Sequence, residues 1–333
     1  MSAGYASRLS SYPNKGIVGL PESFDSKRQR DLKLKKLSEL VRDSKHLVVV
    51  TGAGISTSAG IPDFRGPEGI WTLEKKENNR KRKSRQSKPN PNPNRKRKHS
   101  HTTHDQHKLE SSDKRHIKKS TFTKHPIDSD STSMEFSKAQ PTLTHKALTR
   151  LAIDGKLKYL ITQNVDGLHR RAGLVRNMHC SLHGCAFTEK CESSDCRAEF
   201  FRDFDIGGMS FQPTGRRCTL CNEKLLDTLL DWEDALPEAD FQRAEAECEK
   251  ADLVICLGTS LRIEPVGSLP LRASKFVIVN LQVTPKDEHA ALVIKASVDS
   301  VMEHLMSYLG FDDNWKDTAA PVERIWTAGQ SEK

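Results

Sequence analysis

Four short apolar runs constrain the fold of this chain more than any other feature of its sequence. They cover residues 46–50, 159–163, 253–257 and 276–280, and each is rich in aliphatic and β-branched residues. Strands of a parallel sheet are buried on both faces, so they read as continuous apolar runs rather than alternating ones. Apolar residues recur at helical spacing over 26–44 and 298–309, and helical segments separate the later runs. The sequence therefore predicts an α/β fold built on a doubly wound parallel sheet.

A strongly basic tract interrupts this pattern. Residues 75–124 contain 18 Lys or Arg and only four acidic residues, a net charge of +14, whereas the whole chain carries +9. Leu109, Ile117 and Phe122 are its only aliphatic or aromatic residues. Such a segment cannot bury enough surface to offset the entropy lost on ordering it. We therefore expect a basic, disordered insert over 75–132 in an otherwise mildly acidic protein.

Membrane and secretory classes are not favoured. No apolar run approaches the ~18–20 residues of a membrane span, and the first 45 residues lack the apolar core of a signal peptide. We therefore expect an intracellular protein. In that setting the eight cysteines are expected to be metal ligands, core residues or reactive thiols rather than a disulfide framework.

Small or amide-bearing residues follow each predicted strand. The four strand ends read Gly52-Ala-Gly54-Ile-Ser56, Gln163-Asn164-Val-Asp166, Gly258-Thr259-Ser260 and Asn280-Leu-Gln282. Ligands of open α/β sheets bind outside the carboxyl ends of the strands. The four segments are therefore expected to line one crevice.

A glycine turn after the first strand favours a dinucleotide as the ligand of that crevice. Backbone N–H groups of Gly52-x-Gly54 can bind a pyrophosphate, although Thr57 replaces the third glycine of the usual motif and no acidic residue follows for the ribose. Asn280 and Gln282 can supply the missing ribose contacts. The prediction is a Rossmann-like dinucleotide-binding domain, and the alternative is a tight turn without a ligand.

Two further features leave alternatives open. Asp63, Phe64 and Arg65 follow the glycine turn closely, either as part of the ligand site or as a solvated loop with one ion pair. Thirteen histidines are present, of which His183 and His169 are placed best for catalysis. Spacing alone cannot choose between those two.

Four cysteines predict a zinc site. The pattern is Cys191-x4-Cys196, 21 residues, then Cys218-x2-Cys221, and each pair can hold two thiolates on one turn. Four sulfur ligands leave no position for water or substrate, so the zinc is expected to be structural. Cys248 and Cys256 are interpreted as core residues, and Cys180 and Cys185 are left without an assigned role.

These motifs together resemble the sirtuins, which are NAD-dependent protein-lysine deacylases. The resemblance rests on residues 52–66, 163–169, 182–184, 258–260 and 279–282 and on the cysteines. Residues 1–25, 71–73 and 230–234 resemble the nuclear sirtuin-6 type, including its plant counterparts. The resemblance covers about 1–74 and 133–312. Cys185 stands where the family usually has Asn or Asp, and the first cysteine pair is two residues wider than usual.

The resemblance implies a role for each motif residue. Cofactor contacts are expected from Gly52, Ala53, Gly54, Ser56 and Thr57 at the phosphates, from Asp63, Phe64, Arg65, Trp71 and Gln163 at the nicotinamide and its ribose, and from Gly258, Thr259, Ser260, Asn280, Gln282 and Val298 at the adenosine half. Asp231 and Trp232 would border the acyl-lysine tunnel. His183, Asn164 and Asp166 would be catalytic.

The implied reaction transfers an acyl group from lysine to the ADP-ribose of NAD. The acyl oxygen displaces nicotinamide from the ribose, and His183, as a neutral base, activates a ribose hydroxyl. The expected products are free lysine, nicotinamide and O-acyl-ADP-ribose, with histones or other nuclear proteins as substrates. Two alternatives remain: a mono-ADP-ribosyltransferase, and a chromatin-bound NAD or ADP-ribose sensor with little turnover.

Two basic clusters, residues 80–83 and 95–98, favour nuclear import and non-specific contact with DNA or nucleosomes. The alternative is a solvated insert without a partner. The predicted organisation comprises an N-terminal segment and helix (1–45), the Rossmann-like domain (46–74, 133–182 and 226–310), the insert (75–132), a small inserted zinc-binding module (183–225) and a flexible tail (311–333).

Overall fold

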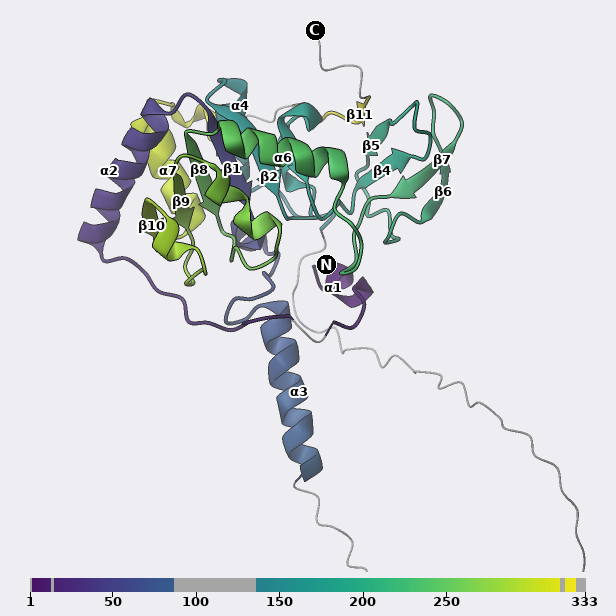
Figure 1. Cartoon of the computed structure of the whole chain (residues 1–333), viewed down its shortest axis with the longest axis horizontal. Helices are drawn as coiled ribbons and strands as arrows, with labels where there is room; N and C mark the ends of the chain where they lie inside the picture. The colour runs from purple at the N-terminus through teal and green to yellow at the C-terminus, as the bar shows by residue number, and fades with distance from the viewer. Residues whose placement is uncertain (1, 13–14, 87–135, 318–320, 328–333) are drawn as a thin grey trace, which may run out of the picture. The chain divides into compact units, whose positions relative to one another are not determined.

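The computed structural model describes residues 2–12, 15–86, 136–317 and 321–327 (Figure 1). Contacts divide the chain into two units, one formed by Met1–Lys76 with Ser133–Lys333 and the other by Glu77–Thr132. Of the second unit the described residues, 77–86, belong to a helix, α3 (Ile70–Gln86). The sequence predicted disorder there, but Lys, Glu, Arg and Gln are good helix formers. The rest of the expected insert, including the cluster at 95–98, lies outside the described residues.

A six-stranded parallel sheet forms the centre of the first unit, in the order β10-β9-β8-β1-β2-β3. Its strands are β1 (Leu47–Thr51), β2 (Leu157–Thr162), β3 (His179–Ser181), β8 (Leu253–Leu257), β9 (Phe276–Val279) and β10 (Leu292–Ile294). The four predicted strands are confirmed within two residues at each end, and β3 and β10 were not predicted. Along the sequence, β2 and β3 are added on one side of β1, and β8, β9 and β10 are then added on its other side. This reversal places a crevice at the carboxyl ends of β1 and β8.

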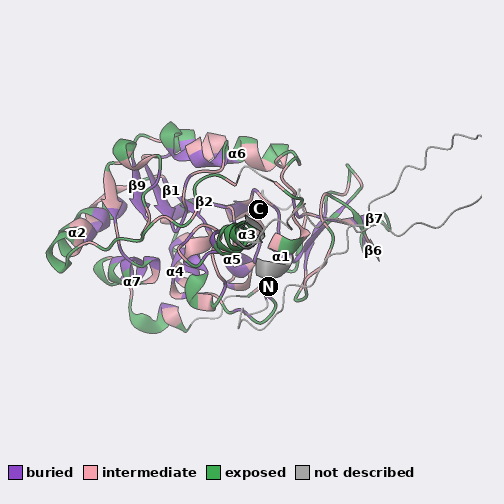
Figure 2. Ribbon diagram, turned by 90° about the horizontal axis from the view of Figure 1, so that it is seen from below, coloured by how far each residue is buried: buried purple, intermediate pink, exposed green. Residues whose placement is uncertain are grey.

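Helices cover both faces of this sheet, as Figure 1 shows. They are α2 (Lys27–Asp43), α4 (Leu143–Ile153) and α7 (Val298–Tyr308) on one face, and α6 (Glu238–Lys250) with the 3₁₀ helix η4 (Val266–Arg272) on the other. Along β1, Leu47 and Val49 pack with the first group, and Val48 and Val50 with the second. Both faces of the strand are therefore buried, and the doubly wound fold is confirmed (Figure 2).

Side-chain caps fix where two of these helices begin. Ser26 caps α2 in a reciprocal arrangement with Gln29. Thr142 caps α4, and its partner is His145 instead of the usual glutamate or glutamine. The start of α4 is thereby tied to a histidine side chain.

A second, antiparallel sheet holds the cysteines, with strand order β11-β5-β4-β7-β6. Its strands are β4 (Thr188–Cys191), β5 (Glu199–Phe201), β6 (Pro213–Arg217), β7 (Lys224–Asp227) and β11 (Ile325–Trp326). The fold is thus a Rossmann-like sheet with a small inserted module. The module extends beyond the predicted 183–225, because β7 reaches residue 227 and β11 pairs with β5.

The described part of the C-terminal segment is more ordered than the flexible tail that the sequence predicted for 311–333. It contains a 3₁₀ helix, η6 (Asp313–Lys316), as well as β11. Trp315 is 4% exposed and belongs to the core beneath α4 and α7. Trp315 anchors η6 to this core, and an isolated tryptophan gives no periodic apolar pattern in the sequence.

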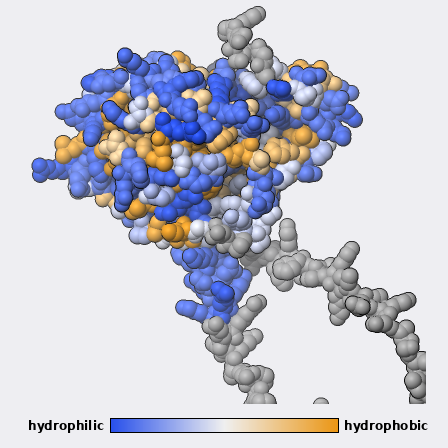
Figure 3. Space-filling model, viewed as in Figure 1, coloured by the Kyte–Doolittle hydropathy of each residue, from blue (hydrophilic) through white to orange (hydrophobic). Residues whose placement is uncertain are grey.

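Hydrophilic residues cover most of the face seen in Figure 3, with a band of apolar residues across it. Within the described ranges, none of the helices combines the length and the hydrophobicity that a bilayer crossing requires.

Candidate active site

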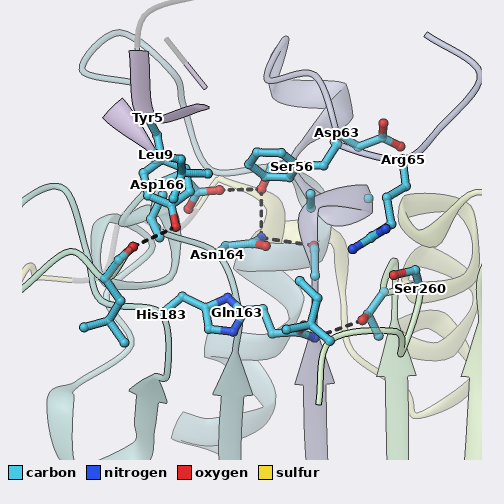
Figure 4. A pocket seen from close by; sticks show the side chains of 18 of the residues that line it. Tyr5, Leu9, Ser56, Asp63, Arg65, Gln163, Asn164, Asp166, His183 and Ser260 are labelled. Atoms are coloured by element: carbon cyan, nitrogen blue, oxygen red, sulfur yellow. Dashed lines mark hydrogen bonds between the residues drawn. The ribbon is translucent and has the colours of Figure 1, made fainter. Parts of the chain in front are cut away.

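A cavity of about 700 Å³ lies where the carboxyl ends of β1, β2, β8 and β9 meet (Figure 4). All but two of the predicted catalytic, cofactor and substrate residues line it. These are Gly52, Ala53, Gly54, Ser56, Asp63, Phe64, Arg65, Trp71, Gln163, Asn164, Asp166, His183, Asp231, Trp232, Gly258, Thr259, Ser260, Asn280 and Gln282. Thr57 and Val298 are the two outside the lining. Thr57 is exposed and donates a hydrogen bond to the Gly54 carbonyl, and Val298 packs into the core at the start of α7.

Two glycine turns meet at the base of this cavity. The Gly54 N–H donates to the Gly258 carbonyl at 2.8 Å. A Cβ on Gly54 would lie 2.8 Å from the Gly258 Cα, and Gly258 itself has φ +58°. Neither position therefore accepts a side chain without displacement of the other turn. The backbone of both turns stays bare, as close approach of a phosphate requires.

A buried hydrogen-bond network joins the first two strand ends. The Asn164 amide donates to the Gly52 carbonyl at 3.0 Å and to the Ser56 hydroxyl at 3.3 Å. Ser56 donates in turn to one carboxylate oxygen of Asp166 at 2.7 Å (Figure 4). The other oxygen accepts the Leu168 N–H at 2.9 Å. Burial raises the pKa of Asp166. The network fixes both side chains before any ligand binds.

Hydrogen bonds also hold the amide side chains that follow β2 and β9. Gln163 donates to the Thr259 hydroxyl at 2.9 Å. The side chain of Asn280 donates to the Gln282 carbonyl at 2.9 Å, and Gln282 donates to the Leu20 carbonyl at 2.6 Å. Residue 20 belongs to the segment before α2. That segment is therefore tied to the edge of the crevice.

The loop after the first glycine turn is not a solvated ion pair. Asp63 accepts the Gly66 N–H at 2.9 Å, and burial raises its pKa. The Arg65 guanidinium lies 4.7 Å from the Trp71 ring centroid, and burial together with Arg262 lowers its pKa to about 10. Both residues line the cavity, so they belong to the candidate site.

The structure separates the two candidate histidines. His183 follows β3 and lines the cavity, whereas His169 is buried and lies outside the cavity lining. Desolvation lowers the pKa of His183 to about 4, although the Gln163 backbone raises it slightly. The ring is therefore neutral at pH 7 and able to accept a proton. Next to it, Gly184 has φ +81°, and a Cβ there would lie 1.8 Å from the Thr228 carbonyl oxygen.

The N-terminal residues form one wall of the cavity, which the sequence did not predict. Tyr5 and Leu9 line it from α1 (Ser2–Arg8) and the residue after it. The Tyr5 hydroxyl donates to the Leu230 carbonyl at 3.3 Å, and the Ser10 N–H donates to Asp231 at 3.0 Å. Tyr5 and Leu9 are four residues apart, so they lie on the same face of a helix. This spacing is the one feature of the sequence that could have indicated that they act together.

A row of aromatic rings connects the two ends of the cavity. The Trp232 ring centroid lies 5.2 Å from that of Trp71, which lies 4.7 Å from that of Phe64. Tyr5 meets Phe64 edge to face at 6.1 Å. These rings form a largely apolar part of the cavity lining, and Asp231 lies next to Trp232 in the sequence.

The four predicted cysteines meet in the second sheet. The Sγ atoms of Cys191, Cys196, Cys218 and Cys221 all lie within 4.8 Å of one another. The Sγ atoms of Cys191 and Cys221 are 3.4 Å apart and those of Cys196 and Cys218 are 3.7 Å apart, near the ~3.8 Å edge of a tetrahedron with Zn–S bonds of about 2.3 Å. Cys185 packs in a different cluster, with Phe187 and Leu229. The donor set and its geometry fit one structural zinc ion.

Comparisons with known proteins agree on one family. The family model "Sir2 family" matches residues 52–119 and 95–265. The NAD-dependent protein deacetylase SRT1 of Arabidopsis thaliana is 43% identical over 93% of this chain and 56% of its own length. The NAD-dependent protein deacetylase Sirt6 of Drosophila melanogaster is 38% identical, covering 94% of this chain and 86% of the fly protein.

A solved structure of a Sir2 protein with a p53 peptide and NAD+ is similar, with a TM-score of 0.52 and 26% identity. The match covers 84% of this chain and 99% of that one. The chain spans about half the length of the plant relative. From the fold, the strand-end motifs, the cysteine cluster and these matches, the chain belongs to the sirtuin (Sir2) family.

Proposed function

We propose that this protein is an NAD-dependent protein-lysine deacylase. The observation that carries the proposal is the position of His183. This neutral base lines the same cavity as the glycine turn, the Asn164–Asp166 network and the aromatic wall that includes Trp232. One cavity thus holds a phosphate-binding backbone, a proton acceptor and an apolar channel side by side.

Two observations support NAD as the ligand of the cavity. The cavity volume of about 700 Å³ lies within the range of ligand pockets. A Cβ on Gly52, Gly54 or Gly258 would strike the neighbouring turn, so the backbone at the base of the cavity carries no side chain there. When bound, NAD supplies the nicotinamide–ribose bond whose cleavage makes the ribose an acyl acceptor. The adenosine half would be held by Ser260, Asn280 and Gln282.

His183 would take a proton from a ribose hydroxyl during acyl transfer. A base must be unprotonated at the working pH, and the lowered pKa of His183 meets that condition. Asn164 and Asp166 are already oriented by the Ser56 hydroxyl, so little reorganisation is needed. Phe64 and Trp71 would keep water away from the reacting carbon.

The substrate side is proposed to accept an acylated lysine of histones or other nuclear proteins. Its support is the apolar wall from Tyr5 to Trp232, which suits the acyl chain, and the flanking carboxylate of Asp231, which can accept a hydrogen bond from the peptide. The solved Sir2 protein described above binds a p53 peptide.

Nuclear localisation and contact with DNA are also part of this proposal. Arg80–Lys83 are four consecutive exposed cations on α3, a composition that suits both an import signal and phosphate contacts. The test of import is the distribution of a tagged protein lacking residues 78–124. Retention in the nucleus would reject the import signal.

The activity is tested by mass spectrometry of protein incubated with NAD and an acetylated or myristoylated histone H3 peptide. O-acyl-ADP-ribose formed by the unaltered protein is the expected result, and the two chains rank the acyl preference. ADP-ribosylated protein without that product would instead indicate a mono-ADP-ribosyltransferase. NAD binding with neither product would indicate a sensor of NAD or ADP-ribose.

A further inference from the structure

The segment that leads into α2 joins two loops at the edge of the crevice. We call residues 15–25 the brace. The Gly19 N–H donates to the Arg65 carbonyl at 2.9 Å, and the Ser23 N–H donates to the Leu281 carbonyl at 3.1 Å. Arg65 belongs to the loop after the first glycine turn, whereas Leu281 follows β9. The brace therefore connects two parts of the cavity lining that are more than two hundred residues apart in sequence.

An aspartate fixes the end of the brace. The side chain of Asp25 is 8% exposed and pairs with Lys33 on α2 at 2.5 Å. Asp25 also exchanges two hydrogen bonds with Lys295: its N–H donates to the Lys295 carbonyl at 2.8 Å, and its carboxylate accepts the Lys295 N–H at 2.8 Å. Tertiary contacts thus hold the brace along its length, so its backbone carbonyls have defined positions.

The brace determines which end of the Gln282 side-chain amide faces the ligand site. Nε2 of Gln282 lies 2.6 Å from the Leu20 carbonyl oxygen and 3.3 Å from the Arg65 carbonyl oxygen. Both partners can only accept, so the two hydrogens of the amide are directed at them. Among the described residues Oε1 has no hydrogen-bond partner, and it is not a buried atom. Gln282 lines the cavity, and it offers a ligand an oxygen rather than an N–H.

An acceptor at this position can replace a missing acid. Dinucleotide-binding folds for NAD place an Asp or Glu on the 2′-hydroxyl of the adenosine ribose, and those for NADP place an arginine at the 2′-phosphate. A glutamine that rotates freely could serve either ligand, because its amide carries donors and an acceptor. Held by the brace, Gln282 accepts only, as a carboxylate does. Glu264 also lines the cavity, but its exposed carboxylate pairs with Lys286 at 3.2 Å.

We propose that the brace makes Gln282 a specificity-determining residue, which accepts a hydrogen bond from the 2′-hydroxyl of the adenosine ribose and disfavours a dinucleotide with a phosphate there. A phosphate monoester carries about two negative charges at pH 7 and has little hydrogen to donate. NADP would therefore leave the amide oxygen without a donor and place negative charge against it. The choice of ligand class rests on the proposed function, whereas the orientation of Gln282 rests on the brace alone.

Three cations near this edge already donate to the chain itself. Lys295 donates to the Gln282 carbonyl at 2.8 Å and to a carboxylate at 3.1 Å. The Arg65 guanidinium donates to two carbonyls of the brace, and Arg262 donates to a neighbouring backbone carbonyl at 3.1 Å. A 2′-phosphate would have to compete with these contacts for a cation. The arrangement therefore lacks the preformed arginine that NADP sites use.

The first experiment measures the affinities of the full chain for NAD and for NADP by calorimetry without peptide. Loss of one hydrogen bond with an acceptor left unpaired should make NADP bind at least about 10-fold more weakly. Gln282→Ala should remove most of this difference, and Gln282→Glu should keep it, because a carboxylate only accepts. Equal affinities in the unaltered protein overturn the proposal, and so does an unchanged ratio in Gln282→Ala.

The second experiment displaces the brace and leaves Gln282 in place. Gly19 has φ +72°, and a Cβ there would lie 2.9 Å from Cγ2 of Thr72. Gly19→Ala should shift the adjacent Leu20 carbonyl and free the amide to turn, so the ratio of the two affinities should fall at least about 3-fold. Gly155→Ala is the matched control, since Gly155 has φ +70° with open space around it. A ratio in Gly19→Ala equal to that of the control overturns the role of the brace.

These measurements separate the specificity of Gln282 from the proposed function. Melting temperatures identify a variant that does not fold, and if Gly19→Ala is one, the Gln282 variants decide. Selective binding of NAD by a protein that transfers no acyl group would keep the specificity role and reject the deacylase. Acyl transfer by a protein with equal affinities for both dinucleotides would do the reverse, and binding of neither would reject both.

Discussion

The ring of Tyr12 lies stacked on that of Trp232, with 4.8 Å between centroids and 17° between planes. Trp232 borders the cavity that we propose binds acyl-lysine, and on its other side it meets Trp71. A residue close to the start of the chain therefore supports a substrate wall more than two hundred residues away in sequence. The N-terminal segment is part of the candidate site.

Replacing Tyr12 with alanine should weaken binding of the acylated peptide and leave NAD binding unchanged. Stacked aromatic pairs contribute about 0.5–1.5 kcal/mol beyond their buried area, which corresponds to about a 2- to 10-fold increase in KM for the peptide. Steady-state kinetics at saturating NAD measure it. Tyr308→Ala, at an exposed position on α7, is the matched control. An equal loss of affinity for NAD would contradict this assignment.

His183→Ala should abolish turnover while the protein stays folded and still binds NAD. A general base contributes roughly 10²- to 10⁴-fold to a rate, so O-acyl-ADP-ribose formation should fall by at least about 100-fold. His304→Ala removes an exposed histidine on α7 and should have no effect. NAD-induced stabilisation against heat checks the fold. If the variant no longer folds, the base assignment loses its support.

The pH dependence of kcat/KM should reflect the lowered pKa of His183. A base with a pKa of about 4 stays unprotonated well below pH 6.5, and kcat/KM reports the free enzyme. We therefore expect no acid limb between pH 8 and about 5.5 in short assays started from neutral stock. An acid limb centred near 6.5, the ordinary pKa of histidine, would show that the ring is not desolvated in solution.

Zinc should be present at one ion per chain and needed for the second sheet. Cys218→Ser removes one of the four ligands, and because structural zinc contributes directly to folding, this module should become sensitive to limited proteolysis. Cys185→Ala, at a buried position outside the cluster, should retain the metal. Metal analysis of both variants tests the ligand set. Loss of zinc from the Cys185 variant alone would overturn it.

The free energy of unfolding should fall as pH drops below 6.5. Burial lowers the pKa values of His145, His169 and His179 in the folded state, so below 6.5 the unfolded chain binds protons that the folded chain does not. Each histidine then costs up to about 1.4 kcal/mol per pH unit. Asp166, whose pKa is raised, offsets part of this loss at the acidic end.

Urea unfolding at pH 7.5, 6.5 and 5.5 measures that dependence. His145→Gln should reduce the slope by about one proton, because that buried ring has a lowered pKa in the folded protein. A free energy of unfolding that does not vary over this range would mean that these rings are protonated in the folded protein.

The sequence predicted the parts of the fold that repeat a simple pattern. Strands β1, β2, β8 and β9 are apolar on both sides because both of their faces are covered, and such runs are visible without a structure. β3 and β10 have only three residues each, and β3 reads His-Cys-Ser, so neither shows a pattern. Their existence depends on pairing with a neighbour that is distant in sequence.

The candidate site was predictable where its residues follow strands. The carboxyl ends of parallel strands meet at one edge, so the lining residues that directly follow the strands could be named from spacing, whereas Trp71, Asp231 and Trp232 were expected only from the resemblance. The choice between His169 and His183 could not, because it depends on how β3 joins the sheet. Tyr5, Leu9 and Tyr12 were not found because their contacts form only when the N-terminal segment folds against residues 230–232.

Pairing of β11 with β5 means that the chain enters or leaves the zinc sheet by three connections, after β3, after β7 and before β11. A module attached by one or two connections can rotate as a rigid body about them, whereas three connections restrict that rotation. Opening of the cleft is therefore expected to come from displacement of the N-terminal wall, with the two sheets acting as a fixed frame.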